Sequence, residues 1–242
     1  MKIGLLSLTC VLAVFMTVPV MSQQNVRLLR PGRFLIDPPR IELTEQWFGL
    51  QHIGDEWALV RINPKVAAVG PSREICGDRA TDISVDIDGI RQPIALDGTG
   101  GLLFLVSGIQ GLSERPITTT LSGPRFLYPG QEVNVGIQAS DLYTLEALGT
   151  ATRENTDFVF VNYVLWLREG RRAQELASFG RNWLGHPRQI VWAGDLDGDR
   201  RPDLLFDFPL GDVGQNFVLY LSSAAAGDQL VSRVATFSTP GC

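Results

Sequence analysis

Short runs of apolar residues, bounded by glycine, proline, aspartate or asparagine, recur along the chain after residue 22. The runs are rich in valine, isoleucine, leucine and aromatic residues, and none has the long 3.6-residue period of an amphipathic helix. Turn residues separate the runs at intervals of about 8–15 residues, which is typical of a sandwich or a barrel-like fold. The sequence therefore predicts an all-β protein built from antiparallel sheets.

The expected strands follow directly from these runs. They are 47–51, 57–62, 83–87, 102–107, 132–138, 143–149, 158–167, 173–179, 189–193, 203–208, 217–222 and 230–237. The first two should form a hairpin around Gly54 and Asp55. A second hairpin turn is expected at 167–171, where Gly170 can adopt the positive φ that such a turn requires. Residues 173–179 could form a helical turn instead.

The first 22 residues resemble a secretory signal. Lys2 supplies a positive start, and a mostly apolar run of about seventeen residues follows, with cleavage expected after Ser22. A retained membrane anchor is an alternative, but the run is at the lower limit for a span and Pro19 would interrupt its last turn. Lipid attachment at Cys10 is a third option, although Cys10 lies early, in the middle of the run. The expected location is therefore secreted or periplasmic.

The polar stretch 150–157 suggests a boundary between two regions, 23–150 and 151–242. After signal removal two cysteines remain, Cys76 and Cys242, and an even count in an exported protein favours a disulfide. Two free thiols are the alternative. A zinc site of cysteines and histidines is disfavoured, because the mature chain has two distant cysteines and the whole chain has two histidines.

Charge and composition exclude some functions. The net charge of the chain is −5, so no basic surface that could follow a phosphate backbone is implied. Forty-five per cent hydrophobic and nineteen per cent charged residues are ordinary for a globular protein rather than a disordered one. After cleavage of the signal no membrane span is expected. The composition does not indicate an oligomeric state or a partner.

One motif carries chemistry, the segment 195–203 with the sequence DLDGDRRPD. Its aspartates stand at the first, third, fifth and ninth positions of a calcium-type loop, in which alternate carboxylates point inward and the seventh residue contributes its carbonyl. Gly198 allows the loop to curl. The predicted metal ligands are Asp195, Asp197, Asp199, Asp203 and the carbonyl of Arg201, and the predicted ion is calcium.

The loop is not an EF-hand. The twelfth position is Phe206 rather than a bidentate glutamate, and its flanks are strand-like. Arg200 stands at the sixth position, where glycine is usual, and a positive φ there would cost roughly 1 kcal/mol. A plain solvated turn, with Arg200 and Arg201 neutralising the aspartates, is the alternative to a metal site.

The segment Ala193-Gly194 followed by DLDGDRRPDLLFDF, and then 216–223, resembles an FG-GAP/VCBS-type unit. In that pattern one strand enters a calcium loop, a second leaves it and a third ends in a short turn. The stretch 157–242 is similar to uncharacterised secreted bacterial proteins with one such unit. The resemblance implies an FG-GAP-like calcium-loop hairpin in the C-terminal half. A single copy cannot close a propeller, so no adhesive function is carried over.

No enzyme signature is present. His52 lies in an apolar hairpin, His186 lies in a Gly-His-Pro turn, and no nucleophile elbow or phosphate-binding loop occurs. Five tryptophans are expected to pack mainly in the core, with Trp183 as the best candidate for ligand contact. The sequence favours a non-enzymatic envelope or extracellular module that is stabilised by calcium and binds a polymer or a protein.

The alternative is a calcium-stabilised secreted hydrolase that acts on a polysaccharide or another envelope polymer. Such an enzyme would need two carboxylates about 5–9 Å apart. The candidate carboxylates are Glu132, Asp141, Glu146 and Asp207.

Overall fold

The computed structural model describes residues 25–34, 45–53, 56–70, 82–87, 101–154, 157–180, 183–185, 188–208 and 215–239. Within these ranges the chain forms β-strands and no helix, so the predicted all-β class is confirmed. All strand pairings are antiparallel. The described part of the chain has no helix long and apolar enough to cross a membrane.

Two sheets come from the first half of the chain. The N-terminal sheet contains, in spatial order, β1 (Arg27–Leu29), β7 (Gly101–Ser107), β3 (Trp47–Ile53), β4 (Glu56–Ile62) and β8 (Arg115–Ile117). The small sheet contains β2 (Gly32–Phe34), β6 (Asp82–Ile87) and β5 (Pro64–Gly70). The predicted hairpin of 47–51 and 57–62 is present as β3 and β4.

The central sheet combines strands from both predicted regions. It contains β18 (Ser232–Thr239), β17 (Gln215–Leu221), β16 (Asp203–Asp207), β15 (Gln189–Gly194) and β9 (Thr119–Phe126). Four of its strands are consecutive in the sequence, whereas β9 comes from the predicted region 23–150 and pairs with β15.

The long-strand sheet is the third five-stranded sheet. It contains β10 (Glu132–Asn134), β11 (Tyr143–Glu154), β12 (Asp157–Glu169), β13 (Arg172–Phe179) and β14 (Trp183–Gly185), of which β13 and β14 both pair with β12. Gly170 has a φ of 57° in the turn between β12 and β13, which confirms the predicted hairpin and makes the helical alternative for 173–179 wrong.

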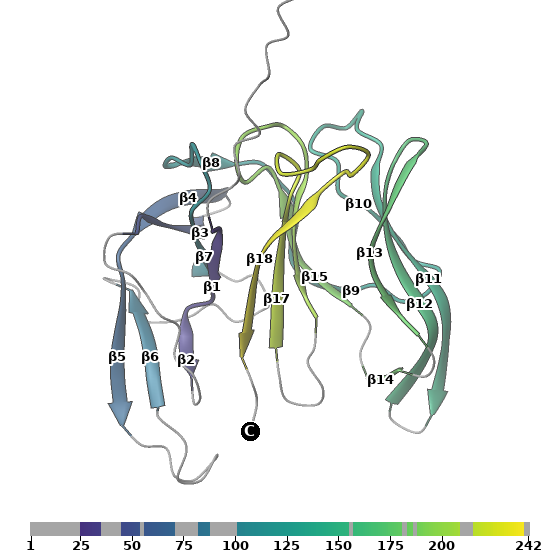
Figure 1. Cartoon of the computed structure of the whole chain (residues 1–242), viewed down its shortest axis with the longest axis horizontal. Coiled ribbons are helices and arrows are strands. Elements are labelled where there is room, and N and C mark those ends of the chain that lie inside the picture. Colours follow the sequence, from purple (N-terminus) through teal and green to yellow (C-terminus); the bar gives the residue numbers. More distant parts are fainter. Residues whose placement is uncertain are drawn as a thin grey trace, which may run out of the picture.

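The central sheet lies between the other two five-stranded sheets (Figure 1). Successive residues of β16 and β17 alternate between two hydrophobic clusters. Leu205 and Leu219 pack with the N-terminal sheet, and Phe206 and Val218 pack with the long-strand sheet. Both faces of the central sheet are therefore buried, and the apolar runs of its strands are continuous for that reason.

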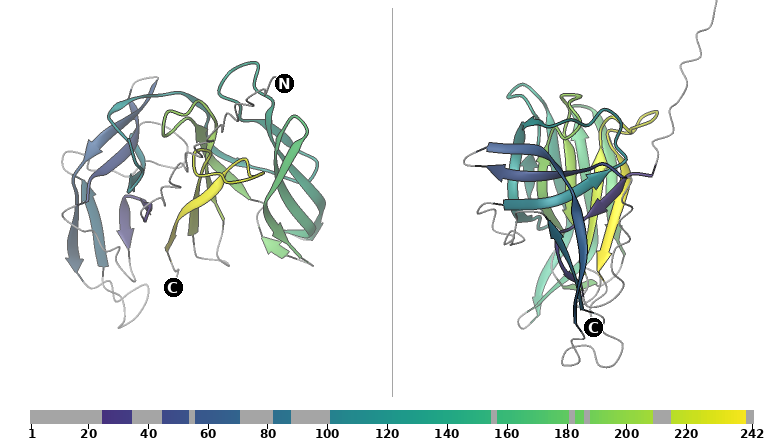
Figure 2. Two further views of the ribbon diagram at one scale, coloured as in Figure 1. Left: turned by 45° about the horizontal axis from the view of Figure 1, so that its top comes forward. Right: turned by 90° about the vertical axis from the view of Figure 1, so that its left-hand side faces the viewer.

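Figure 2 shows the same layers from two further directions, with β18 next to the N-terminal sheet. The boundary proposed between residues 150 and 151 falls within β11, and the division into two regions stays a prediction. The expected signal segment 1–22, Cys76 and Cys242 lie outside the described residues. The disulfide and the export signal therefore also stay predictions.

Candidate metal site

The aspartate-rich loop connects β15 to β16, two adjacent strands of the central sheet. Gly194 pairs with Asp203 at the mouth of this hairpin, so residues 195–202 form a compact loop between the strand ends. Gly198 and Arg200 have φ values of 89° and 65°, which produce the tight curl of the loop. The positive φ expected for Arg200 is therefore present.

Three of the four aspartates converge. One carboxylate oxygen from each of Asp195, Asp197 and Asp203 lies within 4.8 Å of the other two. Asp203 is fully buried and Asp195 is 8% exposed, whereas Asp197 is half-buried. The fourth predicted ligand, Asp199, does not belong to this group. These three residues could hold a metal ion.

Asp203 is the best anchored of the three. Its Oδ2 accepts a hydrogen bond from the backbone N–H of Leu196 at 2.8 Å. Its Oδ1 accepts from the backbone N–H of Ser222 at 2.8 Å and from the Ser222 hydroxyl at 3.0 Å. Asp203 therefore ties together the start of its own loop and the end of β17.

The other aspartates organise the loop through its backbone. Asp195 accepts from the N–H groups of Gly198 at 2.7 Å and Arg200 at 3.2 Å. Asp199 accepts from the N–H of Arg201 at 2.8 Å and from the Ser222 hydroxyl at 2.8 Å. Such bonds from a side chain to a nearby backbone N–H hold short polar loops in a defined curl.

In the absence of a cation, burial and mutual repulsion disfavour the ionised forms of these carboxylates. Burial raises the pKa of Asp203 well above its ordinary value, and the neighbouring charge of Asp197 raises it further. Burial also raises the pKa of Asp197, to which the charges of Asp199 and Asp195 add. A cation among these oxygens would offset both the burial and the repulsion.

The hydrogen bonds of the Arg201 side chain go to groups outside the aspartate cluster. The Arg201 guanidinium donates from Nε to the Tyr143 hydroxyl at 3.3 Å and from Nη2 to the Leu230 carbonyl at 3.3 Å. The hydrogen bond with Tyr143 raises the pKa of Arg201. The Arg200 side chain is exposed. No direct hydrogen bond from the Arg201 guanidinium to a loop aspartate is seen, and the charge of Asp199 also raises the pKa of Arg201.

Three supporting residues were not identified from the sequence. Arg115 of β8 donates from Nη2 to the Leu196 carbonyl at 2.7 Å, and its guanidinium lies where a side chain at Gly198 would project. Ser222 bonds two of the loop aspartates, and the Ser223 hydroxyl donates to Asp197. Arg115 is 80 residues from Asp195 in the sequence, and Ser222 is 19 residues from Asp203. No local spacing of residues therefore predicts these contacts.

Replacing Arg200 with glycine should stabilise the protein by about 1 kcal/mol, because glycine adopts a φ of 65° without the clash that a Cβ causes. Equilibrium denaturation in urea at constant calcium measures this difference. The matched control is Arg171→Gly, the same change at an exposed turn arginine that does not have a positive φ. There the added freedom of the unfolded chain should leave stability unchanged or lower it. Equal effects of the two substitutions would contradict the argument.

Comparison of the chain with family models, with curated proteins and with solved structures finds no match. The resemblance to an FG-GAP/VCBS-type unit therefore rests on the residues of the loop and its flanking strands alone.

The hydrolase candidates lie in different surroundings. Glu132 and Glu146 are opposite each other on β10 and β11, and Glu146 forms an ion pair with Arg168. Asp141 caps a local turn by accepting from the N–H of Gln138 at 2.8 Å. Asp207 is buried, and burial raises its pKa while Arg30 and Arg188 lower it. Of these four carboxylates, only Glu132 and Glu146 are neighbours in strand register.

The remaining candidates divide between core and surface. His52 packs against Trp57 in the β3–β4 hairpin, with ring centroids 5.1 Å apart and the rings tilted by 49°. Trp47, Trp57 and Trp192 are buried, as expected for core tryptophans, and Trp166 is half-buried. His186 and the Trp183 side chain lie outside what the structure describes, so ligand contact by Trp183 stays a prediction.

Proposed function

We propose that this protein is an exported, non-enzymatic β module of the cell envelope or extracellular space, in which the β15–β16 loop binds calcium as a structural ion. The observation that supports the proposal is the convergence of Asp195, Asp197 and Asp203 within 4.8 Å, two of them buried. Carboxylate and carbonyl oxygens in a curled loop are the ligands that calcium prefers. Asp199 and the Arg201 carbonyl would complete the set.

Calcium fits this donor set better than other common ions. Magnesium keeps most of its water and is usually bound through one or two carboxylates, whereas calcium accepts six to eight oxygens in variable geometry. Zinc prefers nitrogen and sulfur ligands, and no histidine or cysteine belongs to this group among the described residues. The D-x-D-G-D spacing and its FG-GAP-like flanks are consistent with the same choice.

A structural role follows from where the loop lies. It joins two strands of a sheet whose faces are both buried, and Asp203 accepts a hydrogen bond from the backbone N–H of Ser222, the residue that follows β17. An ion in this loop would hold three strand ends of the central layer together. The proposed export would place the loop where calcium is abundant, so that even a modest affinity would suffice. The partner of the module would be a polymer or a protein.

Calcium should raise the unfolding temperature of the purified chain. At a concentration about 100 times its Kd, a ligand of the folded state adds about 2.7 kcal/mol, which corresponds to roughly 5–10 °C for a chain of this size. Thermal unfolding followed by circular dichroism, in excess calcium and in chelator, measures the shift. Magnesium at the same concentration is the control and should give a smaller shift. Equal midpoints in calcium and chelator would contradict the calcium site.

A further inference from the structure

The aspartate-rich loop 195–203, here called the metal loop, is held by the long-strand sheet as well as by its own sheet. Arg201 belongs to the loop through its backbone, since its N–H donates to Asp199. Its side chain leaves the loop and reaches the opposite layer, where Nε donates to the Tyr143 hydroxyl on β11. The seventh residue of the loop, whose carbonyl is a predicted ligand, is therefore fixed by a residue of another sheet.

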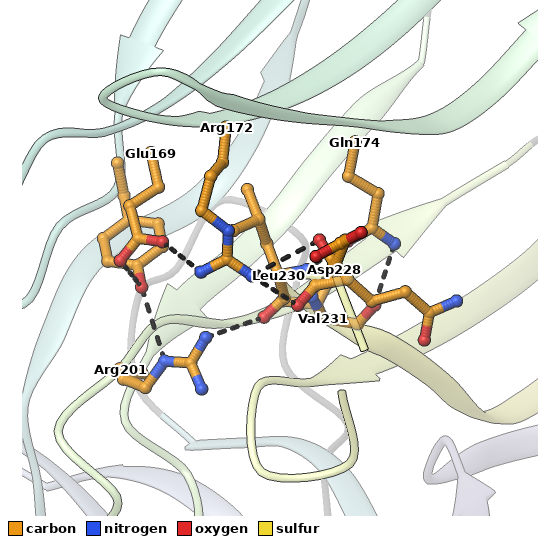
Figure 3. A network of polar contacts seen from close by, with 9 residues as sticks. Glu169, Arg172, Gln174, Arg201, Asp228, Leu230 and Val231 are labelled. Atoms are coloured by element: carbon orange, nitrogen blue, oxygen red, sulfur yellow. Dashed lines mark hydrogen bonds and ion pairs between the residues drawn. The ribbon is translucent and has the colours of Figure 1, made fainter. Parts of the chain in front are cut away.

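A continuous set of polar contacts extends from Tyr143. The Tyr143 hydroxyl donates to the Glu169 carboxylate at the end of β12, and Glu169 accepts from Arg172 Nη1 at 2.8 Å. Arg172 Nη2 then donates to the carbonyls of Asp228 at 3.3 Å and Gln229 at 3.1 Å. Figure 3 shows Arg201, Glu169 and Arg172 in this arrangement.

Gln174 of β13 closes the connection to the segment before β18. Its amide nitrogen donates to the Val231 carbonyl at 2.8 Å, and its oxygen accepts from the N–H groups of Leu230 at 2.6 Å and Val231 at 3.0 Å (Figure 3). We call Tyr143, Glu169, Arg172, Gln174 and Arg201, with the backbone of 228–231, the interlayer network. It joins the long-strand sheet to the segment 222–231.

The segment 222–231 in turn contacts the metal loop at its other end. The single proton of the Ser222 hydroxyl is shared between Asp199 at 2.8 Å and Asp203 at 3.0 Å, and the Ser223 hydroxyl donates to Asp197. The hydrogen bonds therefore form a closed ring. It runs from the loop through Arg201 to the long-strand sheet, then to residues 228–231, and back to the loop aspartates. A shift of the loop would change the geometry of each of these contacts.

We infer that Tyr143 is a positioning residue for the metal loop, so that calcium in the loop is coupled to the docking of the β12–β13 hairpin on the central sheet. The inference rests on the proposed calcium function. A loop whose seventh residue is already held in place pays less of the ordering cost when an ion binds. The coupling is reciprocal, so an ion that orders the loop also stabilises the hairpin contacts.

Tyr143→Phe tests the inference with one atom removed. The ring is buried and remains packed in the core, while the bonds to Arg201 and Glu169 are lost. Calcium titration by calorimetry of the full chain, at a temperature where each variant is folded, should show affinity weakened about three- to tenfold. Tyr220→Phe is the matched control, because its hydroxyl also bonds across these two sheets, to the Leu176 carbonyl, but outside the network. Its affinity should stay within about twofold of the original.

Hydrogen exchange on the unaltered chain provides a second measurement that needs no variant. Calcium should slow amide exchange in residues 167–172, and it should do so less in the β3–β4 hairpin of the N-terminal sheet. Calcium binding with equal affinity in the original chain and Tyr143→Phe, or without protection of 167–172, would overturn the coupling alone. An original chain that takes up no calcium would overturn the proposed function, and the coupling with it.

Discussion

Replacing Asp203 with alanine should lower the free energy of unfolding in excess calcium by about 5–9 kcal/mol. One part of this loss is the stabilisation by the ion, about 2.7 kcal/mol at 100 times the Kd. The other part comes from the backbone N–H groups of Leu196 and Ser222, which both donate to this carboxylate at buried positions. Each would lose its acceptor without access to water, at roughly 1–3 kcal/mol.

The same substitution should cost less in chelator than in calcium. Without an ion, the alanine also removes a buried carboxylate that Asp197 repels, and this gain opposes the lost hydrogen bonds. Urea denaturation under both conditions separates the two contributions. Asp228→Ala, an exposed aspartate of the neighbouring 222–231 segment, is the control and should change stability by less than about 0.5 kcal/mol. If Asp203→Ala lowers the free energy of unfolding equally in calcium and in chelator, the Asp203 carboxylate does not bind the ion.

Replacing Trp192 with alanine should cost about 3–5 kcal/mol, with or without calcium. Trp192 is fully buried, its ring lies edge-on to Phe104 of β7, and its Nε1 donates to the Thr119 hydroxyl of β9 at 3.1 Å. The side chain therefore joins the central sheet to the N-terminal sheet and to its own edge strand. Alanine would leave a void between two layers and remove the hydrogen bond to Thr119.

Trp166→Ala is the matched control for this prediction. Trp166 is half-buried and lies beside Arg168 on the face of β12 opposite the buried Leu165 and Leu167. Its removal should cost less than about 1 kcal/mol, because water can fill the vacated surface. Equilibrium denaturation in urea compares the two variants. Similar losses for both would contradict the assignment of the central sheet as the inner layer.

Strands with uninterrupted apolar runs could be predicted from the sequence, and strands that depend on pairing could not. The apolar runs of β3, β16 and β17, and the alternating apolar positions of β4, correspond to buried side chains, so local pattern and structure agree there. β8 and β9 include Pro116 and Pro124, and β9 also includes Gly123, which are typical of turns. They are strands because they pair at the edges of sheets, where proline is tolerated.

The predicted strand 132–138 is shorter in the structure for a local reason. β10 ends at Asn134, whose side chain accepts a hydrogen bond from the N–H of Gly136 at 2.9 Å. Such a bond favours a turn over continued pairing. Asp141 then packs directly against Gly136, with no room for a side chain there. The apolar alternation of 133, 135 and 137 was therefore a weaker signal than the asparagine and glycine among them.

The sequence by itself determined the all-β class, the curled aspartate loop and the convergence of three of its four carboxylates, because each of these depends on residues close together in the chain. Only the tertiary structure decided that β9 joins the central sheet, that Arg115 and Ser222 brace the loop, and that Tyr143 reaches Arg201. Alternation of apolar residues indicates which face of a strand is buried but not which sheet covers it. That choice depends on how distant faces pack together, and the residues around the metal loop were brought there by this packing.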